Sequence, residues 1–132
     1  MFSRWLRHNP TPLTGAPTVR RQKTYSAQSG YVYQYYYQGH RPWALERGTE
    51  FVFDVSADRK TSLPVSVCIT DEAVESWQKE RRRTLSTTER YAIAKMALFQ
   101  AFDQRETPAA MREAIRVTAA EVRAILSTLE ID

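Results

Sequence analysis

The sequence predicts a two-layer α+β domain, in which an antiparallel β-meander of three to four strands over about residues 19–69 is followed by three helices packed on one face. Two patterns support this prediction. Apolar residues recur with a period of two between residues 31 and 69, and with a period close to four from residue 71 onward. The length of 132 residues and the 42% hydrophobic content are typical of one domain with a single core.

The first half of the sequence predicts strands separated by turns. An edge strand is expected over residues 19–25, where basic side chains would discourage pairing with the edge of another molecule. Gly30 marks a turn after this strand, and Pro42 ends the strand that follows it. Those strands are predicted over residues 31–38, 50–56 and 63–69. Each of them has one apolar face, which is typical of a meander covered on one side only.

The strand over residues 31–38 is rich in tyrosine. Strict alternation places Tyr31, Tyr33, Tyr35 and Tyr37 on one face and Tyr36 on the other. The four tyrosines could form an exposed platform on which a partner stacks, or could lie beneath the helices. We favour the buried arrangement, because a one-sided meander needs every strand to contribute to the same face. The face with Tyr36 is then left for solvent or a weak partner.

The second half of the sequence changes to a helical period and predicts three helices, over about residues 71–83, 87–103 and 108–129. Ser86 and Glu89 have the spacing of a capping box at the start of the middle helix. That helix is apolar on almost every side, so we expect it to touch both the sheet and the other helices. Pro108 is suited to the first turn of the last helix.

Basic residues are concentrated near the N-terminus. The net charge is +4, yet residues 1–45 contain six Lys or Arg and no Asp or Glu. Residues 1–18 also hold prolines and large apolar side chains, so we expect an extended N-terminal arm before a single domain over residues 19–132. This asymmetry predicts a small non-catalytic binding module or accessory subunit that meets another protein through the arm and the sheet edge. The predicted partner-binding residues are Phe2, Arg4, Trp5, Leu6, Arg7 and Tyr36.

The arm also fits other uses, namely contact with a membrane surface, organelle targeting or a loose terminus. No segment approaches the roughly 20 apolar residues needed to cross a bilayer. Cys68 is the only cysteine, so no internal disulfide can form. We therefore expect a cytoplasmic protein.

A nucleic-acid-binding regulatory protein is the second hypothesis. It rests on clustered bases that could grip phosphates, although nearby acids dilute them and a basic helix end also complements the helix dipole. The residues concerned are Arg20, Arg21, Lys23, Arg81, Arg82 and Arg83.

The sequence offers no catalytic, metal-binding or nucleotide-binding motif. The histidines are His8 in the arm and His40 in a turn, and their spacing from Cys68 fits no metal site. We therefore expect neither an enzyme nor a cofactor. His40 and Arg41 beside Trp43 could form an anion pocket, but we favour an interpretation in which Trp43 closes the end of the core.

Overall fold

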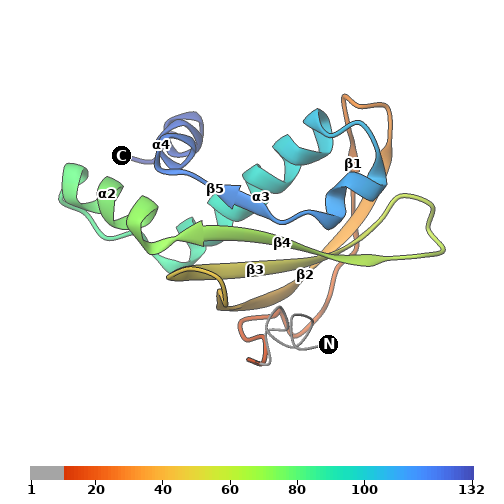
Figure 1. The fold of residues 1–132 in the computed structure, drawn as a ribbon, viewed down its shortest axis with the longest axis horizontal. Coiled ribbons are helices and arrows are strands. Elements are labelled where there is room, and N and C mark those ends of the chain that lie inside the picture. The colour runs from red at the N-terminus through yellow and green to blue at the C-terminus, as the bar shows by residue number, and fades with distance from the viewer. Residues whose placement is uncertain (1–10) are drawn as a thin grey trace.

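The structure, a computed structural model, describes residues 11–132 and has the predicted α+β architecture (Figure 1). The antiparallel strands of the meander are β1 (Lys23–Ser26), β2 (Val32–Pro42), β3 (Gly48–Ser56) and β4 (Leu63–Thr70). A fifth strand, β5 (Ile115–Val117), pairs in parallel with β4, so the sheet order is β1-β2-β3-β4-β5. The helices are α2 (Asp71–Arg81), α3 (Thr87–Gln104), α4 (Ala119–Thr128) and the 3₁₀ helix η1 (Pro108–Arg112).

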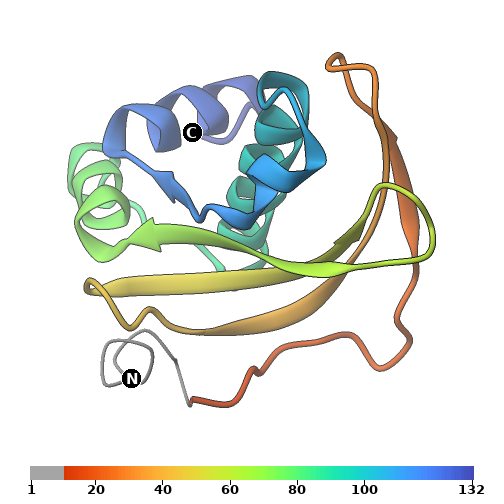
Figure 2. The same cartoon turned by 45° about the vertical axis from the view of Figure 1, so that its right-hand side comes forward.

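The sheet is curled, and the helices lie on its concave side (Figure 2). Helix α3 packs against β4, β5 and α4, as expected of an almost entirely apolar helix. Tyr33 is 0% exposed and its ring stacks on Phe102 of α3, with ring centroids 4.2 Å apart. Tyr35 is also buried, whereas Tyr37 is half-buried and Tyr31, just before β2, is 38% exposed. The buried arrangement of the tyrosine strand is therefore confirmed for its middle residues.

The third predicted helix is shorter than expected. Only residues 119–128 form α4, and the segment before it contains η1 and β5. Ile115 and Val117 are buried while Arg116 between them is exposed, which is the alternation of a strand beside β4. Thr118 then caps α4 in a capping box with Glu121. Periodicity was misleading here because the apolar spacing across residues 111–122 also fits one face of a helix.

The first strand also begins later than predicted. Pairing with β2 starts at Lys23, opposite Tyr35, and the chain before it runs beside β2 without strand structure (Figure 2). It meets β2 again at Thr14, whose N–H donates to the His40 carbonyl at 2.9 Å and whose carbonyl accepts from the His40 N–H at 2.8 Å. Part of the segment expected to belong to the arm is thus attached to the sheet.

A β-bulge in β2 makes this attachment fit. The register with β3 shifts between Tyr37 and Gly39, so one extra residue bends the strand. Gly39 has φ +123°, and a Cβ placed there would lie 2.6 Å from the carbonyl oxygen of Thr14. Only glycine combines this backbone conformation with so close an approach.

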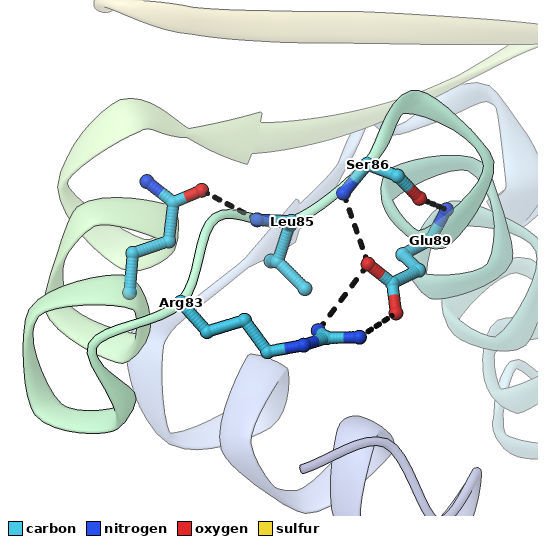
Figure 3. A network of polar contacts seen from close by, with 5 residues as sticks. Arg83, Leu85, Ser86 and Glu89 are labelled. Carbon is cyan, nitrogen blue, oxygen red and sulfur yellow. Dashed lines mark hydrogen bonds and ion pairs between the residues drawn. The ribbon is translucent and has the colours of Figure 1, made fainter.

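The corner between α2 and α3 is held by the predicted capping box (Figure 3). The Ser86 hydroxyl accepts from the Glu89 N–H at 3.1 Å, and the Glu89 carboxylate accepts from the Ser86 N–H at 2.9 Å. The Arg83 guanidinium donates to both carboxylate oxygens of Glu89, at 2.7 and 3.3 Å. Together, the Arg83 guanidinium and the Ser86 N–H lower the pKa of Glu89.

This network predicts an acid-sensitive contribution to stability. Because the folded state lowers the pKa of Glu89 below 4.5, the contribution is complete above that pH and is lost as the pH falls through the lowered pKa. We expect Glu89→Gln to be less stable than the wild type at about pH 7, and the difference to be smaller at about pH 3. Thermal unfolding at both pH values measures this. Glu75→Gln, at an exposed position of α2, is the control, and an equal loss at both pH values would contradict the prediction.

Candidate functional site

The edge of the sheet formed by β1 and β2 is interrupted. On this side of β2, Lys23 pairs opposite Tyr35, and the next paired residue within the described chain is Thr14 opposite His40. Residues 15–22 between them are exposed and form no backbone hydrogen bond with β2. On the side away from β3, the backbone of β2 over residues 36–39 therefore faces no strand, and we call this stretch the edge gap.

An aromatic floor lies beside the edge gap. Tyr37 of β2 and Tyr91 of α3 have ring centroids 4.7 Å apart, and burial raises the pKa of both hydroxyls. Both rings line two cavities, of about 310 and 220 Å³, that Pro17 also borders. The larger cavity reaches the first turn of α3, and the smaller reaches the bases of residues 20–23. Neutral phenols and apolar rings thus form the base of the site.

Four bases surround the smaller cavity. Arg20, Arg21 and Lys23 line it directly, and Lys95 of α3 approaches Lys23 from the concave side. The Lys95 ammonium also lies 5.8 Å from the Phe99 ring centroid. Burial and the like charge of Lys23 lower the pKa of Lys95. None of these four side chains forms an ion pair within residues 11–132, so an anion brought to this edge would relieve their mutual repulsion.

Tyr36 lies at the edge gap on the convex face. The Arg20 guanidinium is 5.7 Å from the centroid of its ring, and a hydrogen bond to Asp54 raises the pKa of its hydroxyl. Four residues predicted for binding, namely Arg20, Arg21, Lys23 and Tyr36, are therefore brought together at one place.

The second predicted basic group lies elsewhere. Arg81 ends α2, which packs beside β4 and α4, and Figure 1 shows α2 and β1 at opposite ends of the molecule. Arg82 forms the C-cap of α2 with φ 53°. Arg83 pairs with Glu89 and lies 5.8 Å from the Trp77 ring centroid. The six bases proposed for nucleic acid thus form two separate groups, and Arg83 is already engaged.

The remaining predicted partner-binding residues belong to the N-terminal arm. Phe2, Arg4, Trp5, Leu6 and Arg7 lie outside the described residues.

His40 and Arg41 face opposite sides of β2, as neighbours on a strand must. The His40 ring is 5.7 Å from that of Phe51, whereas the Arg41 guanidinium donates to Glu50 at 2.9 Å. The two residues therefore do not form the anion pocket considered from the sequence, and Trp43 is half-buried.

Sequence reasoning missed Tyr91 and Lys95. Tyr91, Lys95 and Phe99 recur at a spacing of four and so lie on one face of α3. Lys95 is the only charged residue between Arg90 and Asp103, in a stretch that is otherwise almost entirely apolar. A single lysine within such a helix was the available signal.

Within the described part of the chain, no group of three His, Cys, Asp or Glu side chains is placed to hold a metal ion. Over the same residues, the helices are too short or too polar for any of them to cross a bilayer. Comparison with protein-family models, with curated proteins and with solved structures finds no match for this chain. The function is therefore argued from the edge gap and the residues around it.

Proposed function

We propose that this chain is a small non-catalytic binding module that receives an extended, acidic segment of another protein at the edge gap. The observation that supports this proposal is a stretch of β2 with no strand on its side away from β3, bordered by four bases that have no acidic partner within residues 11–132.

Strand addition is the binding mode that suits the edge. A partner segment in extended conformation can form main-chain hydrogen bonds with β2 between Tyr35 and His40. Residues 15–22 can move aside at little cost, because they have no backbone hydrogen bonds to β2 to lose. Alternate side chains of the partner would then reach the floor of Tyr37 and Tyr91. The short stretch of β2 favours a modest and reversible interaction.

Charge gives the interaction its selectivity. Carboxylates of the partner would neutralise Arg20, Arg21, Lys23 and Lys95, and this attraction weakens as salt screens it. The same bases would repel a basic segment, so the site discriminates by charge as well as by shape.

The charge requirement is tested by selecting peptides from a displayed random library with the full chain, then measuring their affinities by fluorescence anisotropy. We expect the selected peptides to be enriched in Asp and Glu. Arg20→Glu combined with Arg21→Glu should weaken their binding by about tenfold or more, because attraction becomes repulsion. Arg81→Glu combined with Arg82→Glu carries the same charge change at the far end of the molecule and should have little effect.

Selected peptides without acidic residues, or equal affinities in both double variants, would contradict the proposal. Binding of DNA or RNA would support the alternative, a nucleic-acid-binding regulatory protein. In that case the chain would retard DNA or RNA in a strongly salt-dependent manner, and both double variants would weaken the retardation to a similar extent.

A further inference from the structure

A third cavity lies away from the edge gap, at the loop of the β3–β4 hairpin. It has a volume of about 350 Å³ and is enclosed by the start of β2, the loop between β3 and β4, and η1. Its volume falls at the lower end of the range of roughly 300–1,000 Å³ that small-molecule sites occupy.

Tyr33 lines this cavity and has an unusual hydroxyl. Its side chain is 0% exposed, and within residues 11–132 the hydroxyl oxygen has no hydrogen-bond partner. Burial raises the pKa of Tyr33, so the group remains a neutral phenol able to donate. Buried hydroxyls in folded proteins nearly always have a partner, because the hydrogen bonds to water are otherwise lost. A ligand acceptor would supply one if the ligand displaced the side chains that cover the hydroxyl.

The charged residues that line the cavity are Asp58 and Arg112, and they differ in whether they are available to bind a ligand. Asp58 accepts from the N–H groups of Lys60 and Thr61, both at 2.8 Å, and from the Thr61 hydroxyl at 2.9 Å. These bonds lower the pKa of Asp58 to about 2, and they occupy most of its acceptor positions. The side chain of Arg112 in η1 forms neither an ion pair nor a hydrogen bond within the described chain. Its guanidinium is therefore available to an acidic ligand.

The walls of the cavity are mainly apolar. Tyr31, which is 38% exposed, lines it together with Leu63 and Pro108. We propose that this cavity binds a small organic acid whose apolar body packs against these residues. The acid group pairs with Arg112, and an oxygen acceptor of the ligand accepts from the Tyr33 hydroxyl. This assignment does not depend on the function proposed for the edge gap.

The test uses the full chain and isothermal titration with medium-chain and aryl carboxylates, each paired with the corresponding primary alcohol as a neutral probe. We expect saturable binding of at least one acid and weaker binding of its alcohol. Arg112→Gln should weaken acid binding by about tenfold, the effect of losing a charge-assisted hydrogen bond. Arg81→Gln makes the same charge change outside the cavity and should leave the affinity unchanged.

Tyr33→Phe gives a second, independent readout. It should weaken binding of the acid by about fivefold, since one hydrogen bond is lost. It should also raise the melting temperature of the ligand-free protein by about 3 °C, because an unpaired buried hydroxyl is removed. A lower melting temperature would show that the hydroxyl is already paired and would overturn its role. Absence of saturable acid binding up to about 10 mM, or unchanged affinity in Arg112→Gln, would overturn the site itself.

Discussion

Phe102→Ala is expected to lower the free energy of unfolding by about 3–5 kcal/mol, the usual cost of removing a large buried aromatic side chain. Phe102 is 0% exposed and its ring lies 4.2 Å from that of Tyr33, 5.7 Å from Tyr25 and 6.2 Å from Tyr35, measured between centroids. Alanine would leave a cavity at the point where the tyrosine strand meets α3. The loss would be a large part of the 5–15 kcal/mol typical of a whole domain.

Polar contacts from the same turn of α3 strengthen this expectation. The Phe102 carbonyl accepts from the Ser29 hydroxyl at 2.8 Å, and Asp103 accepts from the Tyr25 hydroxyl at 2.8 Å. The β1–β2 hairpin is thus joined to the end of α3 by both packing and hydrogen bonds. Urea unfolding monitored by circular dichroism measures the change, with Gln104→Ala at an exposed position of the same helix as control. A loss for Phe102→Ala below about 1.5 kcal/mol would show that the ring is not central to the core.

Gly39→Ala is the second substitution with a large expected effect, a loss of roughly 2–4 kcal/mol. The backbone at Gly39 has φ +123°, and the new Cβ would lie 2.6 Å from the Thr14 carbonyl oxygen and 3.2 Å from the Leu13 Cβ. A backbone oxygen cannot turn away as a flexible side chain can. The pairing of Thr14 with His40 should therefore break, and the edge gap should lengthen.

Gly30→Ala separates the two causes of this loss. Gly30 also has a positive φ, +98°, but a Cβ there would meet no atom within 4 Å. This control therefore carries the backbone strain, of about 1–3 kcal/mol, without the collision. We expect Gly39→Ala to cost more than Gly30→Ala, and to accelerate hydrogen exchange of the Thr14 and His40 amides. Equal costs and unchanged exchange would mean that the attachment of Thr14 is unimportant.

The features that sequence predicted well are those with a strong local period. Alternation in residues 31–69 identified the strands and placed Tyr33 and Tyr35 on the buried face, because a half-buried strand exposes alternate residues. The capping box at Ser86 and Glu89 similarly located the start of α3, since it needs only residues three apart.

The features that sequence missed depend on contacts between distant residues. β5 is three residues long and is separated in the sequence from its partner β4 by α2, α3 and η1, so no local pattern identifies it. Its one local signal was Thr118 followed by Glu121, the same capping pattern that was recognised at Ser86. A boundary placed there would have shortened the third helix correctly.

The candidate site was predictable only in part. Arg20, Arg21 and Lys23 were identified by charge and Tyr36 by its face, and all four line one cavity at the edge gap. Their assignment to different partners could not be avoided, because the sequence does not show that they lie together. The gap itself arises where residues 15–22 leave β2, and the bulge at Gly39 that allows Thr14 to return depends on tertiary contact.

The most direct test of the proposed function is an NMR titration of the isotopically labelled full chain with an acidic peptide obtained from the selection. Binding at the edge gap predicts that the amide signals of Tyr36, Tyr37 and Gln38 shift and that Lys95 signals move with them. It also predicts that the amide of Tyr37, which points away from β3, exchanges more slowly when the peptide is bound, because main-chain hydrogen bonds form. Shifts centred on Arg81, Arg82 and Arg83, with the signals of residues 36–38 unchanged, would contradict the account.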